Sequence, residues 1–135
     1  MKKPIVAIML DGVLAHYDRN RGGIDIGRPR EGAANICRWL KEELGCIVVV
    51  VTGRRRTDIV ETWLDANGFS YDLVNEGYQH PSVQDASSHW VIADFYLFPE
   101  NRVVTVTSAP DAFAHALDSI TAQVTAAKER EGYNW

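Results

Sequence analysis

The sequence is poor in the features that mark several protein classes. Among 135 residues it has only two cysteines, Cys37 and Cys46, which are too few to hold a fold together by disulfides. We expect both to be reduced and half-buried. Positive charge is not in surplus either, because 14 lysines and arginines stand against 18 aspartates and glutamates, a net charge of −4. Nucleic-acid-binding proteins usually carry a basic patch, and the short cluster at residues 54–56 does not supply one, so we expect no nucleic-acid partner.

Long hydrophobic runs are also missing. The longest strongly apolar stretch spans residues 46–51, whereas a membrane-spanning helix needs about 20 apolar residues. The first residues lead into a short apolar run without a small-residue cleavage site, so we expect no signal peptide, no membrane contact and a cytoplasmic location. A composition of 46% hydrophobic and 24% charged residues is that of an ordinary globular protein, and the length suits one domain over residues 1–135.

Continuous apolar runs predict the strands. A run without alternation of polar and apolar residues is typical of a strand buried on both faces, as in a parallel sheet covered by helices. The predicted strands cover residues 4–10, 46–51, 71–74, 90–97 and 102–106.

Helical patterns lie between these runs. Apolar residues recur every three or four positions over residues 31–44, 58–67 and 108–127, with the tryptophans Trp39 and Trp63 expected to pack in the core. Strands that alternate with helices predict an α/β fold, a three-layer sandwich around a mostly parallel sheet of about five strands. In open sheets of this kind the ligand crevice lies at the carboxyl ends of the strands.

The residues at these strand ends resemble the motifs of the haloacid dehalogenase (HAD) superfamily of phosphohydrolases. In that family the first strand ends in Asp-x-Asp-Gly-Thr/Val-Leu, and residues 9–14 read Met-Leu-Asp-Gly-Val-Leu. The second motif is a strand ending in Thr or Ser, commonly followed by Gly-Arg, and residues 52–54 read Thr-Gly-Arg. The resemblance implies a HAD-like (Rossmannoid) sandwich, and the spacing of the motifs leaves no room for a cap domain.

The resemblance also implies which groups a phosphatase of this family needs. The first aspartate of the first motif is the nucleophile, and the second is the general acid and base. The Thr or Ser of the second motif and a lysine of the third hold the phosphoryl oxygens. The first aspartate and a late acidic pair hold Mg²⁺, a hard cation that prefers oxygen ligands.

Most of these groups are absent from this sequence. The nucleophile position is Met9, the lysine position is Gly77, and the two late aspartates fall on Phe98 and Pro99. A thioether neither attacks phosphorus nor ligates Mg²⁺ usefully. Loss of a nucleophile alone costs on the order of 10⁶ in rate in comparable enzymes. We therefore expect no native phosphatase activity.

Only reactive groups have been lost, whereas the scaffold residues around them remain, as at residues 12–14 and 53–54. Our first interpretation is a HAD-like scaffold whose phosphatase site has been erased, by engineering, to leave an apolar pocket. That pocket would bind, or weakly transform, a small apolar or aromatic molecule without a cofactor. Its lining would consist of Met9, Val13, Thr52, Gly77, Phe98 and Pro99.

Three side chains are candidates for a base or nucleophile in such a pocket. Asp11 would stand against Met9 and Phe98, where desolvation makes a carboxylate a better base, although it could equally cap its own turn. His16 and His80 lie in the long loops that flank the strand ends, where a histidine is either a catalytic base or a solvated loop residue.

Two alternatives stay open. The first is a natural, non-catalytic HAD-like pseudoenzyme with a binding or regulatory role. The second is a residual Mg²⁺-dependent phosphohydrolase, in which Asp11 and Glu100 would hold the metal. The sequence leaves the oligomeric state open.

Overall fold

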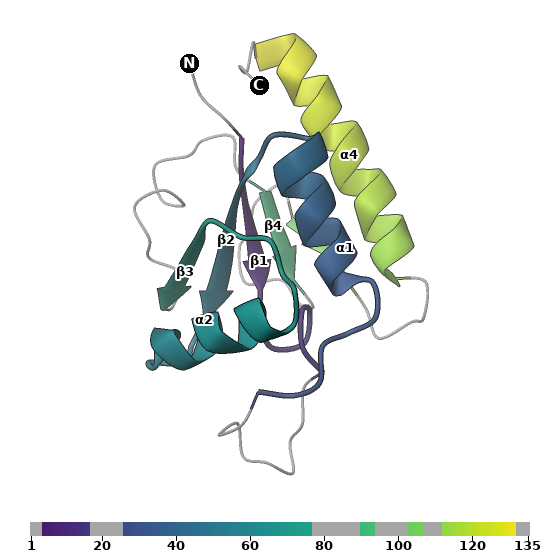
Figure 1. Cartoon of the computed structure of the whole chain (residues 1–135). Coiled ribbons are helices and arrows are strands. Elements are labelled where there is room, and N and C mark those ends of the chain that lie inside the picture. The colour runs from purple at the N-terminus through teal and green to yellow at the C-terminus, as the bar shows by residue number, and fades with distance from the viewer. Residues whose placement is uncertain (1–3, 17–25, 77–89, 94–102, 107–111, 132–135) are drawn as a thin grey trace.

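A computed structural model describes residues 4–16, 26–76, 90–93, 103–106 and 112–131 (Figure 1). Its elements follow the predicted order, and their bounds differ from the predicted ones by a few residues at the ends that are described. The strands are β1 (Ile5–Met9), β2 (Ile47–Thr52), β3 (Leu73–Glu76), β4 (Trp90–Ala93) and β5 (Val103–Thr105). The helices are α1 (Ala33–Arg38), its π-helical continuation η2 (Trp39–Glu43), α2 (Thr57–Ala66) and α4 (Ala112–Glu131).

The strands form one sheet in the order β3-β2-β1-β4-β5, and every neighbouring pair is parallel. The predicted α/β character and parallel pairing are therefore confirmed. From β1 the chain adds β2 and then β3 on one side, and it then returns to add β4 and β5 on the other. The direction of the strand order thus reverses between β1 and β4, and a doubly wound sheet places its ligand crevice outside the carboxyl ends of the strands at such a switch point.

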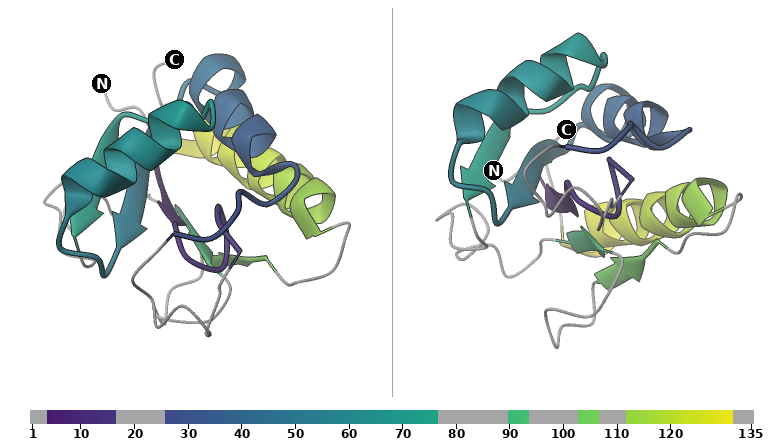
Figure 2. Two further views of the ribbon diagram at one scale, coloured as in Figure 1. Left: turned by 60° about the horizontal axis from the view of Figure 1, so that its bottom comes forward. Right: turned by 90° about the horizontal axis from the view of Figure 1, so that it is seen from below.

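The helices α1, α2 and α4 lie on the same side of the sheet in both views of Figure 2. This is the arrangement that right-handed crossovers from β1 to β2 and from β2 to β3 produce for α1 and α2. The second helical layer of the predicted sandwich would come from the chain after β3 and after β4, and those segments lie outside the described residues. No helix in the described ranges is both long and apolar enough to cross a membrane.

The central strands are buried on both faces, as their unbroken apolar runs predict. Consecutive residues of a strand point to opposite faces of the sheet. In β1 the consecutive residues Ala7 and Ile8 are 1% and 0% exposed, and in β2 Val49 and Val50 are both 0% exposed. The last helix, α4, contributes one apolar stripe, in which Ile120 and its helical neighbours face the core. The buried members of that stripe are Ala112, Phe113, Ala116, Ile120, Val124 and Ala127.

The two helix tryptophans behave differently. Trp63 is partly buried and stacks on Phe69, with ring centroids 5.3 Å apart, as expected of a packing residue. Trp39 is 38% exposed, so the expectation that it packs in the core is wrong. It lies where α1 widens into the π-helical turn η2, in which the Leu44 N–H donates to the Trp39 carbonyl oxygen at 3.0 Å. The Trp39 indole N–H reaches the Thr121 hydroxyl of α4 at 3.1 Å and so stays hydrogen-bonded at the surface.

Candidate functional site

The candidate site lies at the carboxyl ends of β1 and β2, beside the switch point of the sheet. These strands are neighbours in parallel register, with Met9 opposite Val51. The segments that leave them therefore emerge side by side. The residues that follow β1 and β2 are also those that carry the two HAD-like motifs.

A tight turn follows β1 and places Asp11 at the rim of the sheet. Gly12 adopts a positive φ of 88°, a backbone conformation that only glycine adopts readily. The Gly12 N–H donates to the Ala15 carbonyl at 2.9 Å, and the Leu14 N–H donates to the Leu10 carbonyl at 3.0 Å. The turn closes on itself through these bonds and fixes the backbone from which the Asp11 side chain projects.

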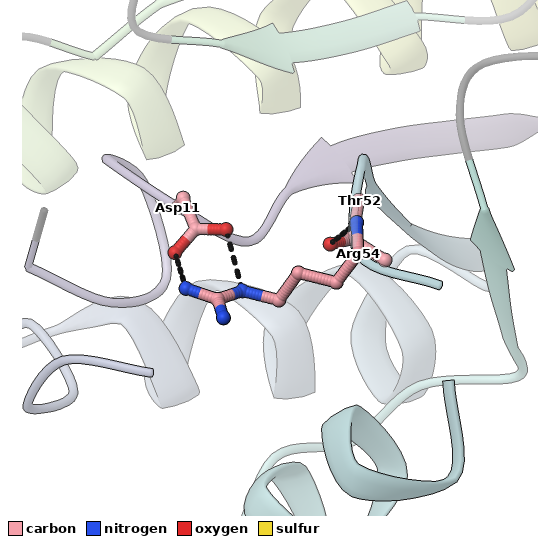
Figure 3. Close-up of polar contacts among 3 residues, drawn as sticks. All are labelled: Asp11, Thr52 and Arg54. Atoms are coloured by element: carbon pink, nitrogen blue, oxygen red, sulfur yellow. Dashed lines mark hydrogen bonds and ion pairs between the residues drawn. The ribbon is translucent and has the colours of Figure 1, made fainter. Parts of the chain in front are cut away.

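A second turn follows β2 and directs Arg54 toward β1. The backbone N–H of Arg54 donates to the Thr52 hydroxyl at 3.0 Å (Figure 3). Such a bond from residue i+2 to a threonine side chain is a common way to reverse the chain after a strand. Thr52 is only 2% exposed, and its hydroxyl oxygen accepts this bond within the turn.

Asp11 and Arg54 form a two-pronged ion pair (Figure 3). Arg54 Nε donates to Asp11 Oδ2 at 3.0 Å, and Arg54 Nη2 donates to Asp11 Oδ1 at 2.9 Å. The Arg54 side chain is 18% exposed and the Asp11 side chain is 25% exposed, so both charges are partly withdrawn from water. A planar guanidinium matches a carboxylate in this way, and such bidentate pairs are among the stronger and more specific hydrogen-bonded contacts.

A second arginine contacts the same turn. Arg30 Nη1 donates to the Gly12 carbonyl oxygen at 2.9 Å, and its guanidinium lies 4.8 Å from the centre of the Phe113 ring. Its backbone N–H donates to the Leu14 carbonyl at 2.9 Å. Two guanidinium groups therefore converge on the end of β1, one on the Asp11 side chain and one on the backbone beside it.

Sequence reasoning missed the roles of both arginines. Arg54 to Arg56 stand just before the helix predicted over residues 58–67, where a run of arginines is expected to form a solvated face, and Arg30 directly precedes the helix predicted over residues 31–44. Arg56 follows that expectation, since it is exposed and pairs with Asp58 at 2.7 Å. The hydrogen bond from Arg56 lowers the Asp58 pKa to about 2. The Thr-Gly-Arg motif was the one available signal that Arg54 differs from its neighbours.

Of the predicted site residues, Asp11 and Thr52 both hydrogen-bond to Arg54, Asp11 to its side chain and Thr52 to its backbone N–H. Three of the predicted pocket residues, Thr52 among them, are buried. Met9, Val13 and Thr52 are 5%, 0% and 2% exposed, and Met9 and Val13 belong to the hydrophobic core. The side chain of His16 is exposed, and its backbone N–H donates to the Arg28 carbonyl oxygen at 2.7 Å.

The remaining predicted residues lie outside the described part of the chain. They are Gly77, His80, Phe98, Pro99 and Glu100.

The surroundings of Asp11 differ from those expected. We predicted a carboxylate among apolar groups, where desolvation would make it a base. Instead, both of its oxygens accept hydrogen bonds from Arg54. Sequence spacing placed the carboxylate correctly at a strand end, but the direction of a long arginine side chain from the next strand depends on tertiary packing.

The described residues do not fit the Mg²⁺ site that the HAD resemblance implies. The oxygens of Asp11 are engaged by a cation already, and the thioether of Met9 is a soft ligand unsuited to Mg²⁺. Within the described ranges, no three His, Cys, Asp or Glu side chains gather in a way that could hold a metal ion.

No protein-family model matches the chain, and no curated protein matches it.

Proposed function

We propose that this protein is a HAD-like domain without phosphatase activity, a pseudoenzyme that keeps the scaffold of the family and serves a binding or regulatory role. The observation that carries the proposal is the ion pair between Asp11 and Arg54. In a phosphatase of this family the carboxylate at the Asp11 position must exchange protons with the leaving group and with water. Here it is held on both oxygens by a permanently charged guanidinium.

The arrangement of the motif residues supports the family part of the proposal. The Asp-Gly-Val-Leu turn follows β1, the Thr-Gly-Arg turn follows β2, and these two strands are neighbours. Both turns therefore open on one edge, next to the switch point where a doubly wound sheet binds ligands. This is the relation that the HAD resemblance requires of its first two motifs.

The residue at the nucleophile position supports the loss of activity. Met9 is the last residue of β1, is 5% exposed and contributes to the hydrophobic core. It offers no oxygen to attack a phosphoryl group. Since an exposed nucleophile and a mobile acid–base group are both required, the described edge lacks the two groups that carry the reaction.

The burial of Met9 and Val13 favours the pseudoenzyme over an engineered apolar pocket. A pocket that admits a small molecule needs apolar walls that are open to it. Both side chains are packed in the core instead. We also propose a cytoplasmic location, because Cys37 and Cys46 are free and buried thiols.

Turnover of p-nitrophenyl phosphate with and without Mg²⁺ tests the proposal. We expect the wild-type protein to release p-nitrophenol no faster than the buffer in either case. The matched control is Asp11→Asn, which keeps the shape of the side chain and removes its charge. Mg²⁺-dependent turnover that disappears in Asp11→Asn would overturn the proposal and favour the residual phosphohydrolase.

A second experiment tests the motif alignment itself. The substitutions Met9→Asp, Gly77→Lys, Phe98→Asp and Pro99→Asp together restore the four missing groups. Arg54→Met is added to free the Asp11 carboxylate, and if the alignment is correct, the restored protein gains Mg²⁺ binding and phosphatase activity. A restored protein that remains folded, as judged by circular dichroism, and gains neither would contradict the HAD assignment.

A further inference from the structure

We propose that a groove between η2 and α4 binds a basic amphipathic helix of a partner protein. The groove has a volume of about 570 Å³ and is lined by Trp39 of η2 and by side chains of α4 between residues 117 and 129. It lies toward the amino ends of the strands, because η2 ends at Glu43, just before β2 begins at Ile47. The surface is therefore separate from the edge that carries Asp11, and the proposal goes beyond the loss of phosphatase chemistry.

Trp39 supplies the apolar wall of the groove. Its side chain is 38% exposed, and its indole N–H donates to the Thr121 hydroxyl of α4 at 3.1 Å. The ring is thus held in place before a partner binds. Tryptophan is among the residues that most often carry the binding energy of an interface. Trp39 is also the first residue of the π-helical turn η2, and such turns are rare and frequently found at functional sites.

The shape of the groove suits a helix. In Figure 1 and in both views of Figure 2, α4 lies alongside α1, so the groove follows the length of α4. Its α4 wall consists largely of small side chains, which let the backbone of a second helix come close. These small residues are Thr121, Ala122, Thr125 and Ala126. The lined part of α4 is about 18 Å long, which is room for about three turns of a partner helix.

Carboxylates stand at both ends of this wall. Asp118 and Glu129 are exposed, and they lie about 16 Å apart along the helix axis, close to three full turns, so both project from one face of α4. None of the described residues that line the groove is basic, and the nearby Lys128 and Arg130 are not among them. A complementary helix has apolar side chains for Trp39 and two basic residues about three turns apart.

The same features argue against two other occupants. A small molecule is normally enclosed on most of its surface, whereas this groove is largely open to solvent. A second copy of the chain, with the two α4 helices antiparallel about a two-fold axis, would bring Asp118 of each copy toward Glu129 of the other. Like charges that face each other across an interface oppose association.

Selection from a displayed library of helical peptides tests the proposal. The peptides have about 18 residues, with apolar residues at helical spacing and Lys, Glu or Gln at every other position. We expect the wild-type protein to enrich peptides with two lysines about eleven positions apart. Fluorescence anisotropy should show that Trp39→Ala weakens binding of a selected peptide about tenfold or more. The control is Ile59→Ala, which removes an exposed apolar side chain of α2 and should leave binding unchanged.

Charge reversal tests the recognition separately. Asp118→Lys/Glu129→Lys should weaken binding of the selected peptide and strengthen binding of the same peptide with glutamate in place of its two lysines. Glu31→Lys/Glu61→Lys changes the net charge equally at exposed positions outside the groove and should change either affinity less than about threefold. If Trp39→Ala fails to fold, as judged by circular dichroism, this comparison decides the proposal.

Three results would overturn it. The first is that no basic peptide is enriched. The second is that the selected peptide binds equally to the groove variants and to their controls. The third is that sedimentation shows a dimer of the wild-type protein that Asp118→Lys/Glu129→Lys abolishes, which would give the groove to a second copy. Phosphatase turnover by the wild-type protein would remove the proposed function and leave this surface untouched.

Discussion

Cys37 and Cys46 are free thiols in the core, and burial raises the pKa of each from 9.0 to about 12. We expected half-buried thiols, whereas these are 0% and 4% exposed. Cys37 lies within α1 and Cys46 directly precedes β2, and both belong to the hydrophobic core, where apolar neighbours exclude water from the sulfur. A buried thiol of this kind behaves as a small apolar residue.

The raised thiol pKa values predict how stability depends on pH. The unfolded chain releases these protons near pH 9, whereas the folded protein retains them until about pH 12. Because the unfolded state binds fewer protons in this window, the free energy of unfolding should fall as pH rises from 9 toward 12. The expected slope is up to about 1 kcal/mol per thiol for each pH unit. Urea unfolding between pH 8 and 11 measures it.

The control for this pH dependence is Cys37→Ala/Cys46→Ala. Its unfolding free energy should decline less steeply over the same range. Tyr71, whose pKa is also raised to about 12 by burial and by its bond to Asp65, contributes a remaining slope of the same sign. Identical slopes for the wild type and the double variant would show that the thiols are not the cause.

The sequence predicted the position of a residue well where that position follows from the end of a strand. A carboxylate at residue 11 was expected at the end of a strand, and it lies there. The partner of that carboxylate was not predicted, because Arg54, Arg55 and Arg56 are chemically identical and only the Thr-Gly-Arg motif, whose turn at Thr52 directs Arg54 inward, distinguishes them.

At the level of elements, the turn after β1 decides where Asp11 points. Gly12→Ala places a Cβ on a residue with φ of 88°, which should lower the free energy of unfolding by about 1–2 kcal/mol. Gly53→Ala is the matched control after β2, since a Cβ there meets no atom within 4 Å and the backbone is not in the left-handed region. Chemical denaturation of both variants checks the prediction, and equal losses would contradict the strained turn.

The contact of β4 with α4 supplies a second test at this scale. Trp90 is 1% exposed, and its indole N–H donates to the Gln123 side chain at 3.1 Å. Trp90→Phe should cost about 1–3 kcal/mol, because it removes this bond and leaves a gap in the core. Trp39→Phe removes a similar bond to Thr121 at an exposed site and should cost less than about 1 kcal/mol. A larger loss for Trp39→Phe than for Trp90→Phe in urea unfolding would contradict this ranking.

The sequence predicted the type and order of the elements because periodicity reflects burial. The wider winding of η2 was not predictable, since a π-helical turn has no apolar period of its own. Trp39 is the first residue of this turn, and its indole is exposed and donates to the Thr121 hydroxyl of α4.

At the level of the whole molecule, the sequence favoured a parallel sheet but contained no direct signal for the order of its strands. That order, β3-β2-β1-β4-β5, reverses beside β1 and brings the two motif turns to one edge. The convergence of Asp11, Thr52 and Arg54 is therefore a consequence of topology, which local patterns do not encode.

The central claim is that the edge formed by the ends of β1 and β2 no longer carries phosphatase chemistry. Turnover of p-nitrophenyl phosphate by the wild-type protein with and without Mg²⁺, beside Asp11→Asn, tests it most directly. We predict that neither protein releases p-nitrophenol faster than the buffer, because Met9 is buried and offers no nucleophile and Arg54 holds both oxygens of Asp11. Mg²⁺-dependent turnover by the wild type that is lost in Asp11→Asn would contradict the account.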